Sequence, residues 1–385
     1  MRITIIYTVT QGMRRHIMKV VNFTLLILLT LSGCGGGGDS GSDDRETGYI
    51  TPAGIGGLHY QTASQTGTTD AAGRFRYYPG ERLSLSIGNL PLYDDIPVSD
   101  YITPLDFVAS IRTQLDTAGL TDEGLLSHKP QEQFLIEKTV IMNLTRFLLS
   151  LNWEGNTADG KGIDIRQRVI SQINAALPDL SGPVDFSVSE ADFVKEGTSP
   201  SPANQLLARI CFYPAGDELC ETPPTPEEIA AAEPAPDNPE DRIPGMEYSE
   251  DLANKRDRII KAIRKVDDVG RDEARQYLKR ELDAISLVRA NRYYLDEETA
   301  NLSASDTSIK TVQIRKINGT PSLSGIEAKS TNPLDVVIHA YNRQGANVDY
   351  FIDGEAGKEG EVLINFKPSG DYRWIKKQLR VIIEP

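Results

Sequence analysis

Three cysteines are the most reactive side chains in this chain of 385 residues, and their surroundings favour two kinds of covalent bond. Eight residues separate Cys211 from Cys220, and Pro214 and Gly216 among them favour a turn that brings the thiols together. A disulfide here would close a small ring, which the chain-entropy account credits with about 2–3 kcal/mol of stabilisation. We predict this disulfide, with two unpaired thiols as the alternative. Cys34 stands directly before four glycines, and its setting points to modification.

Positive charge, an apolar stretch and small residues follow one another before Cys34. They are Arg14, Arg15 and Lys19, then residues 20–31, then the run Leu31-Ser32-Gly33. The apolar stretch suits a secretory core of roughly 7–15 residues and is too short for a spanning helix, which needs about 20. This layout resembles the signal of bacterial lipoproteins. The alternative is an N-terminal helix of a soluble protein, which the glycines after Cys34 argue against.

The resemblance implies a lipid-anchored protein of the cell envelope. Residues 1–33 would be removed as a signal peptide, Cys34 would carry fatty acyl chains such as palmitate, and residues 34–47 would form a flexible, acidic tether. In lipoproteins of this type an aspartate after the cysteine marks retention at the inner membrane. Because Gly35 occupies that position, the resemblance implies the outer membrane, with the periplasmic or surface face left open.

The charge balance limits the classes of partner. The chain carries a formal net charge of −14 at pH 7, so its surface repels nucleic acid phosphates and anionic lipid headgroups. We therefore expect no nucleic acid partner. Contact with the membrane is expected through the lipid anchor alone.

One loop offers oxygen ligands at near-alternate positions, as calcium-binding loops do. The candidates are Asn152, Glu154, Asn156 and Asp159. Thr157 and Ile163 occupy the places where an EF-hand loop has its glycine and its bidentate glutamate. We interpret the loop as a connection between helices, with a calcium site as the alternative, and we expect no other metal.

The motifs of catalysis are absent or incomplete. Residues 155–161 fit the phosphate-loop pattern G-x-x-x-x-G-K, but Gly162 replaces the Ser or Thr whose hydroxyl binds magnesium. His59, His128 and His339 lie far apart in the sequence, in different segments. No G-x-S-x-G, H-E-x-x-H or C-x-x-C motif occurs. We expect no enzymatic activity and no cofactor, although a pair of glycosidase carboxylates would leave no local motif.

Residues 48–100 alternate between apolar and polar side chains and predict a small antiparallel β unit. Residues 58–61 are expected to form a strand, residues 70–73 a turn, and residues 74–77 the returning strand. Thr69-Asp70, Gly73 and Phe75 resemble the T-D-x-x-G-x-F hairpin of carboxypeptidase-regulatory-like β-sandwich modules.

This resemblance extends over residues 48–196, the range that such a module and its following helices occupy in adhesin-like bacterial surface lipoproteins. It implies no catalytic residues. Chains of this layout are sometimes labelled organic-solvent ABC-transporter permeases. The sequence contradicts a literal permease, because no segment after Cys34 is long and apolar enough to cross a bilayer.

Residues 101–196 change to helical periodicity and predict a helical domain. One apolar face repeats at steps of three and four residues: Phe134, Leu135, Ile141, Leu144, Phe147, Leu148 and Leu151. A second helix is predicted over residues 164–177, and Ser189 is expected to cap a short third one.

Residues 197–248 contain many prolines and acidic residues and predict a semi-rigid, solvated linker that includes the cysteine ring. Residues 249–295 then predict two amphipathic helices, arranged as a hairpin or as one kinked helix. A basic cluster interrupts the general acidity: Lys255, Arg256, Arg258, Lys261, Arg264 and Lys265. We interpret this cluster as a solvated helix face, with a dock for the acidic linker or an acidic partner as the alternative.

Residues 296–385 predict a β-sandwich of the immunoglobulin-like type, because strand-like runs alternate with turn residues. The expected strands are residues 311–317, 334–341, 348–352, 361–366 and 378–383. Trp374 is a candidate core or edge anchor. The whole chain is therefore expected to be an α+β multidomain protein: a small N-terminal β unit packed with helices, a linker, a helical hairpin and a C-terminal sandwich.

These features together predict a non-enzymatic, lipid-anchored envelope protein that acts as an interaction or adhesion scaffold, with a protein partner in the envelope or on a surface. The alternative is a periplasm-facing lipoprotein that assists an envelope transport or assembly system.

Overall fold

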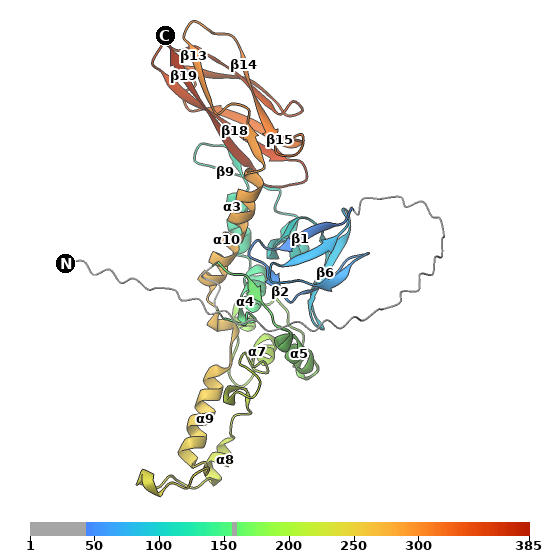
Figure 1. Cartoon of the computed structure of the whole chain (residues 1–385), viewed down its shortest axis with the longest axis vertical. Helices are drawn as coiled ribbons and strands as arrows, with labels where there is room; N and C mark the ends of the chain where they lie inside the picture. The colour runs from blue at the N-terminus through green and yellow to red at the C-terminus, as the bar shows by residue number, and fades with distance from the viewer. Residues whose placement is uncertain (1–43, 156–159) are drawn as a thin grey trace, which may run out of the picture. The chain divides into compact units, whose positions relative to one another are not determined.

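The computed structural model describes residues 44–155 and 160–385, which form an N-terminal β unit, a helical body and a C-terminal β-sandwich (Figure 1). The predicted α+β multidomain class is confirmed. No helix within these residues is long and apolar enough to span a membrane. The signal segment, Cys34 and most of the tether lie outside the described residues.

The N-terminal unit contains a three-stranded sheet of order β5-β1-β8 and a four-stranded sheet of order β4-β3-β6-β7. Its strands are β1 (Glu46–Ile50), β2 (Ile55–Gly56), β3 (His59–Gln61), β4 (Thr66–Thr68), β5 (Arg74–Tyr77), β6 (Arg82–Ile87), β7 (Leu90–Pro97) and β8 (Tyr101–Ile102). The strand over residues 74–77 exists as predicted, but it pairs with β1 and not with β3. The short strand β4 pairs with β3 on the side opposite β6. Both edges of β3 are therefore occupied, and β5 cannot pair with it.

Three residues of the T-D-x-x-G-x-F pattern, Thr69, Gly73 and Phe75, have structural roles at this turn. Thr69 Oγ1 accepts a hydrogen bond from Leu58 N–H at 2.9 Å and donates one to the Ile55 carbonyl at 2.7 Å. Gly73 has a φ of 69°, and an added Cβ would lie 2.6 Å from the Ile50 carbonyl oxygen, so only glycine fits. Phe75 is 1 % exposed and anchors β5 in the core.

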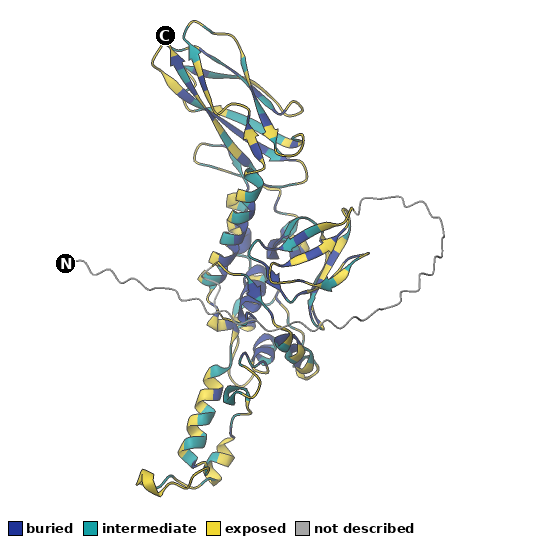
Figure 2. Cartoon of the chain, in the orientation of Figure 1, coloured by how far each residue is buried: buried dark blue, intermediate teal, exposed yellow. Residues whose placement is uncertain are grey.

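The helical body follows; it contains the strand pair β9–β10 and the strand β11, which pairs in parallel with β2 of the β unit. Its elements are α1 (Pro104–Phe107), α2 (Ala109–Arg112), β9 (Gly119–Leu120), β10 (Leu126–Ser127), α3 (Lys129–Ile136), α4 (Thr139–Ser150), β11 (Ile163–Asp164), α5 (Gln167–Ala176), η1 (Leu177–Asp179), α6 (Glu190–Phe193) and α7 (Pro202–Leu207). Helix α4 is buried along almost its whole length (Figure 2). Ser189 caps α6 as predicted, because its Oγ accepts a hydrogen bond from Asp192 N–H at 3.2 Å.

The apolar face predicted around residues 134–151 is divided between α3 and α4, and one of its members is wrong. Phe134 is 53 % exposed. Helix α3 ends before residues 137–138, where the chain turns into α4, so the two helices do not share one continuous apolar face. Within α3, Leu135 faces the core, and Phe134, one position earlier, faces the solvent. The ammonium group of Lys138 lies 3.8 Å from the centre of the Phe134 ring and covers part of it.

The segment predicted as a solvated linker is only partly extended. Helix α7 and the residues after it insert Leu206, Leu207, Ile210 and Phe212 into the main core. The following residues form η2 (Glu218–Cys220), α8 (Pro226–Ala231) and η3 (Pro239–Asp241). The many prolines of this segment favoured the prediction of a linker, although it contains a short apolar run. Burial of these apolar side chains offsets the loss of chain entropy when the run becomes ordered.

The basic cluster docks acidic and backbone groups of this same chain and is not simply a solvated face. Lys255 pairs with Glu221 at 2.6 Å, Arg258 with Glu218 at 2.7 Å, and Lys265 with Glu196 at 2.7 Å. Arg256 and Arg264 donate to backbone carbonyls, and Lys261 pairs within its own helix. The alternative interpretation, a dock for the acidic linker, is therefore the one that the structure supports.

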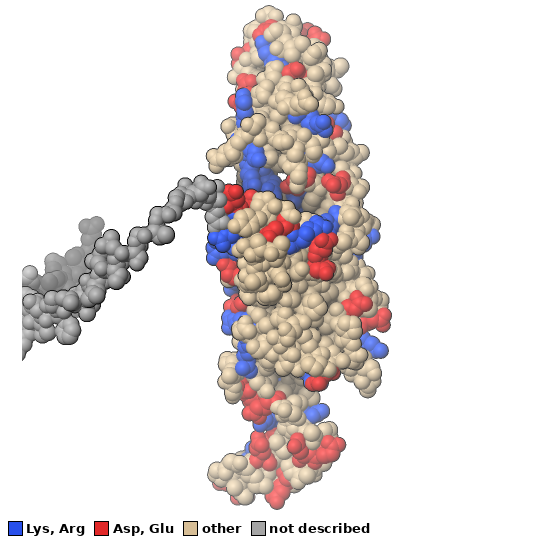
Figure 3. Space-filling view, turned by 90° about the vertical axis from the view of Figure 1, so that its right-hand side faces the viewer, with Lys and Arg blue, Asp and Glu red and all other residues tan. Residues whose placement is uncertain are grey.

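We call residues 221–248 the acidic arm, because they carry eight acidic residues and one basic residue. Figure 3 shows acidic side chains gathered at the foot of the view, where this arm lies. The carboxylates closest to α9 are held by its basic face, whereas those further along the arm remain exposed to solvent.

Helices α9 (Ser249–Ala262) and α10 (Arg271–Ala290), joined through η4 (Val266–Asp268), are not a hairpin. Helix α9 packs on α8 and η2, whereas α10 packs on α3 and α4 and then leads into the sandwich (Figure 1). Near the middle of α10, Glu281 is 2 % exposed, and its Oε2 accepts a hydrogen bond from Ala53 N–H at 2.7 Å. The helix therefore contacts the β unit as well as the helical body.

Eight strands form the C-terminal sandwich, in two four-stranded sheets of order β12-β14-β17-β16 and β13-β19-β18-β15. They are β12 (Tyr293–Leu295), β13 (Thr299–Ser303), β14 (Lys310–Lys316), β15 (Leu323–Ser330), β16 (Val336–Asn342), β17 (Asn347–Ile352), β18 (Glu359–Pro368) and β19 (Ile375–Glu384). The five predicted strands correspond to β14 and β16–β19. The sandwich has an apolar core of its own, separate from the core of the β unit and helical body.

A buried arginine fixes η4 and α6 to helix α4. The Arg146 side chain is 3 % exposed and donates hydrogen bonds to the Val269 carbonyl at 2.7 Å, to Glu190 at 2.9 Å and to Asp267 at 2.7 Å. These contacts join the start of α10 to the most buried helix, so they hold the two together before α10 reaches the sandwich.

Replacing this arginine is expected to destabilise the fold. Arg146→Ala should lower the free energy of unfolding by about 1–3 kcal/mol, because the buried Val269 carbonyl loses its donor, whereas Asp267 is 64 % exposed and can be solvated. Urea unfolding followed by circular dichroism measures the loss. The matched control is Arg209→Ala, which removes an exposed pair with Asp179 and should cost about 0–1 kcal/mol. Equal losses in the two variants would contradict the anchoring role.

Candidate functional site

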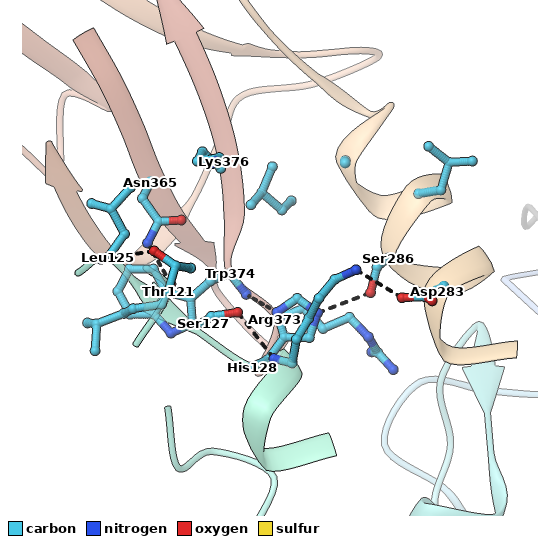
Figure 4. A pocket seen from close by; sticks show the side chains of 15 residues that line it. Thr121, Leu125, Ser127, His128, Asp283, Ser286, Asn365, Arg373, Trp374 and Lys376 are labelled. Carbon is cyan, nitrogen blue, oxygen red and sulfur yellow. Dashed lines mark hydrogen bonds and ion pairs between the residues drawn. The ribbon is translucent and has the colours of Figure 1, made fainter. Parts of the chain in front are cut away.

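The helical body and the sandwich meet through polar and charged side chains and not through a shared apolar core. Four segments build this junction: the β9–β10 hairpin, the start of α3, the end of α10, and residues 371–376, which lead into β19. Figure 4 shows side chains from all four segments converging on one place. We call this region the junction.

His128, directly before α3, links both sides of the junction. Its Nδ1 accepts a hydrogen bond from the Trp374 backbone N–H at 3.0 Å. A neutral imidazole that accepts at Nδ1 carries its proton on Nε2, and this nitrogen lies 3.1 Å from Ser286 Oγ on α10. Both ring nitrogens are therefore used to hold the sandwich and α10 against α3.

The surroundings of His128 favour its neutral form. Burial lowers the pKa of His128 to about 4, and the nearby cations Arg373 and Lys129 act in the same direction, whereas Asp371 and Asp283 oppose them. The side chain is 5 % exposed. Protonation at Nδ1 would remove the acceptor for Trp374 N–H, so a charged His128 is incompatible with this geometry.

A buried ionic group lies beside His128. Arg373 Nε is 3.5 Å from Glu132 Oε1, and the two side chains are 8 % and 6 % exposed. Tyr372 donates a hydrogen bond from its hydroxyl to the same Glu132 oxygen at 2.6 Å, and the Arg373 guanidinium lies 4.2 Å from the centre of the Tyr372 ring. Burial raises the pKa of the Tyr372 hydroxyl, and Glu132 raises it further, so the tyrosine stays a donor.

Arg289 connects this group to the β unit. It pairs with Asp100, which lies directly before β8, and its Nε is 3.1 Å from Asp371 Oδ2 in the sandwich segment. Although burial acts to raise the pKa of Asp100, the positive charges of Arg289 and Arg292 hold it below its usual range. One side chain of α10 thus contacts two parts of the chain that are far apart in sequence.

The β9–β10 hairpin makes a second set of contacts with the sandwich. Leu126 donates its backbone N–H to Glu327 at 2.6 Å, and its carbonyl accepts a hydrogen bond from Asn365 Nδ2 at 2.8 Å. Asn365 also donates to Glu327 at 2.7 Å, which fixes the two sandwich side chains relative to each other. Lys376 pairs with Glu123 at 2.9 Å nearer the solvent.

A cleft of about 500 Å³ lies among these contacts and is open to solvent; we call it the junction cleft. Its walls are Thr121, Leu125, Leu126, Ser127, His128, Lys129, Asp283, Ser286, Leu287, Ala290, Asn365, Arg373, Trp374, Ile375 and Lys376. Trp374 stands over Gly325 of β15, where an added Cβ would lie 2.7 Å from the indole. Clefts of this size between modules are common ligand sites in proteins.

His128 is not available as a general acid or base near neutral pH, because both ring nitrogens are committed and burial lowers its pKa to about 4. The cleft instead presents apolar walls with lysine and arginine side chains among them.

The structure places the predicted sites as follows. The Cys211–Cys220 disulfide is present. Of the calcium candidates, Asn156 and Asp159 lie outside the described residues. Asn152 is buried and accepts a hydrogen bond from Asp164 N–H at 2.9 Å, and Glu154 pairs with Lys161 at 3.4 Å. No group of three or more His, Cys, Asp or Glu side chains suited to a metal ion occurs among the described residues.

The sequence alone does not indicate the junction. His128 is one of several histidines that lie far apart in the sequence, and no local pattern marks the pair Tyr372-Arg373. One local signal was available: His128-Lys129-Pro130 opens a helix, and Glu132 falls one turn after His128. Nothing in the sequence could place that turn against residues 371–376.

Comparisons with known proteins give no assignment. No protein-family model matches the chain, and no curated protein matches it. Among solved structures, the chain is similar to the crystal structure of the S-layer protein SbsC domains 4 and 5, with 10 % sequence identity and a TM-score of 0.18. The match covers 24 % of this chain and 51 % of that one. A TM-score this low carries no argument about fold or function.

The neutral state of His128 predicts that stability depends on pH. Its folded-state pKa is about 4 and its unfolded value about 6.5, so the unfolded chain takes up the extra proton as pH falls between these values. The contribution of neutral His128 to the free energy of unfolding is present above pH 6.5 and is lost as the pH falls towards 4. Proton linkage predicts that this residue alone lowers the free energy of unfolding by about 2 kcal/mol between pH 7 and pH 5.

Urea unfolding of the wild type at pH 7 and pH 5, compared with His128→Gln, measures this contribution. The variant should be less stable than the wild type at pH 7. The decrease in its free energy of unfolding from pH 7 to pH 5 should be smaller than that of the wild type by about 2 kcal/mol. The control is His59→Gln on β3, because His59 is exposed. An unchanged pH difference in His128→Gln would show that the histidine is not held neutral by the junction.

Proposed function

We propose that this protein is a lipid-anchored component of the cell envelope that acts as an interaction scaffold. In this proposal Cys34 carries the lipid, and the described residues present the sandwich and the acidic arm to a protein partner. The function is binding and positioning, with no catalytic step.

The observation that carries the scaffold proposal is the junction itself. Arg289, Arg373 and Glu132 are largely buried there, and a buried charge must keep its partner or incur a large desolvation cost. The sandwich is therefore held in one arrangement on the helical body. A fixed arrangement of modules is what a protein that positions a partner requires.

The envelope location is supported by the sequence and by the disulfide. The run from Leu31 to Cys34 after a short apolar stretch is typical of lipoprotein signals, and disulfides such as Cys211–Cys220 persist in oxidising compartments. The net charge of −14 gives the polypeptide no affinity of its own for anionic membranes, so a lipid is needed for attachment.

The second candidate is a periplasm-facing accessory of a transport or assembly system, which would use the same anchor. The two candidates differ in exposure at the cell surface. Protease treatment of intact cells should degrade a surface scaffold, and cleavage within the exposed acidic arm gives a defined fragment. A chain that resists protease in intact cells and is cut only after the outer membrane is opened would favour the accessory role.

Replacing the anchor cysteine tests the proposal. Cys34→Ser should abolish incorporation of an alkyne-bearing fatty acid and move the protein out of the outer-membrane fraction, because serine cannot form the thioether to lipid. In-gel fluorescence after click labelling and membrane fractionation measure both effects. Cys220→Ser is the matched control and should retain the label, since it removes only the disulfide. Equal labelling of the wild type and Cys34→Ser would overturn the proposal.

A further inference from the structure

We propose that the Cys211–Cys220 disulfide is a site of thiol–disulfide exchange, which a dithiol reduces, and that Arg168 makes Cys220 the first sulfur to leave. This activity goes beyond the scaffold role and does not depend on it. Three features support it: the contacts of helix α5 with both cysteines, the positive charge beside Cys220, and a pocket that reaches the disulfide.

Helix α5 holds both cysteines through two side chains that lie one turn apart. Gln172 accepts a hydrogen bond from the Cys211 backbone N–H at 2.8 Å and donates one to the Cys211 carbonyl at 3.3 Å. Arg168, four residues earlier, places its Nη2 3.5 Å from Cys220 Sγ. Because residues four apart lie on the same face of a helix, one face of α5 positions both ends of the disulfide.

The positive charge of Arg168 is not used in an ion pair. Among the residues that the structure describes, Arg168 has no carboxylate partner, and its Nε is buried without a hydrogen bond. The nearby carboxylate of Glu218 is held by Arg258 of α9. A cation beside a sulfur stabilises the thiolate form. Arg168 is therefore placed to stabilise a negative charge that Cys220 carries only after the S–S bond breaks.

The protonated form of a reduced Cys220 would also have partners. The carbonyl oxygens of Tyr213 and Pro214 lie 3.7 Å and 3.6 Å from Cys220 Sγ. A thiol is a weak hydrogen-bond donor, so it can donate to either carbonyl once it is protonated. The present arrangement thus accommodates Cys220 as a thiolate, beside Arg168, and as a thiol.

A pocket gives a reductant access to the disulfide. It has a volume of about 140 Å³, is open to solvent and is lined by both cysteines, each of which is half-buried. Apolar side chains such as Leu219, Ile259 and Ile263 form other parts of its wall. A thiol can therefore approach the bond while the chain stays folded.

The exchange takes two steps. A thiolate of the dithiol attacks Cys211 Sγ, the S–S bond breaks, and its electron pair leaves with Cys220 as a thiolate beside Arg168. The second thiolate of the reductant then attacks the reductant's sulfur in the mixed disulfide and releases Cys211. The two cysteines gain two electrons and two protons in total, and the dithiol is oxidised to a disulfide.

The chain on both sides of the ring is held by contacts that do not need the disulfide. Phe212 is 7 % exposed and belongs to the main core, and Glu218 pairs with Arg258 at 2.7 Å. Reduction should therefore free the turn over residues 213–217 without releasing its ends. The two thiols stay close together, so that an oxidant can form the bond again.

The experiment uses the full chain in lipid particles. The folded protein is treated with dithiothreitol, free thiols are alkylated with iodoacetamide at intervals, and mass spectrometry of a digest follows Cys211 and Cys220 separately. A parallel sample receives glutathione, a monothiol, and peptide mapping locates the mixed disulfide that forms first. Circular dichroism checks that the chain stays folded.

We expect reduction of the folded wild type, with the glutathione adduct mainly on Cys211. Arg168→Gln should slow reduction by about threefold or more, because a leaving thiolate without a cation is less stable. It should also raise the pH midpoint of Cys220 alkylation by about one unit. Arg168→Lys keeps the positive charge and should restore most of both effects.

The matched control is Arg166→Gln, which removes one positive charge from the residue directly before α5. Arg166 is exposed and pairs with Asp164, and it should leave the rate and the pH midpoint unchanged. A readout in the wild type, the position of the adduct, does not depend on whether any variant folds.

Three outcomes would overturn the proposal. Reduction that requires a denaturant would show that the disulfide is structural only. A rate and a pH midpoint in Arg168→Gln equal to those of Arg166→Gln would remove the role of Arg168. Glutathione adducts divided equally between the cysteines, or found mainly on Cys220, would show that Cys220 is not the preferred leaving sulfur.

Discussion

Arg289 is the side chain on which the arrangement of the described chain depends most directly. It extends from the last turn of α10 and pairs with Asp100 of the β unit and with Asp371 of the segment that leads into β19. No other element within the described range runs from the helical body into the sandwich as α10 does. A single guanidinium can serve both carboxylates because it presents five donors in a fixed plane.

This ionic joint has different consequences from an apolar one. The two cores would pack against each other in several orientations if only apolar surface joined them, because the hydrophobic effect has no direction. At the junction, each of His128, Arg373 and Glu132 has a defined partner at a defined distance. The desolvation of these groups costs free energy, so the joint adds orientation more than stability.

The acidic character of the chain is distributed unevenly, and the distribution follows from how its basic residues are used. The cations of α9 are bound to carboxylates and carbonyls of neighbouring segments, which leaves the outer part of the acidic arm unbalanced. At the junction cleft, Lys129 and Lys376 are likewise paired with carboxylates, those of Asp283 and Glu123, through exposed contacts.

The sequence by itself determined the local features. Alternation predicted strands such as residues 74–77, three- and four-residue spacing predicted the buried face of α4, and the turn between Cys211 and Cys220 predicted the disulfide. Each of these depends on residues close together in the chain. The strands that sequence reasoning missed, β12, β13 and β15, are short or lack clear alternation, and they exist because neighbouring strands pair with them.

Only the tertiary structure decided the partners of β5, the burial of Leu206, Leu207, Ile210 and Phe212, and the whole junction. His128 and Trp374 are 246 positions apart, and Arg289 and Asp100 are 189 apart. A histidine or an arginine has no local pattern that tells whether it is solvated or buried against a distant segment. Its role depends on the desolvation and pairing that arise when the modules pack together, so the physical cause of the site appears only with the fold.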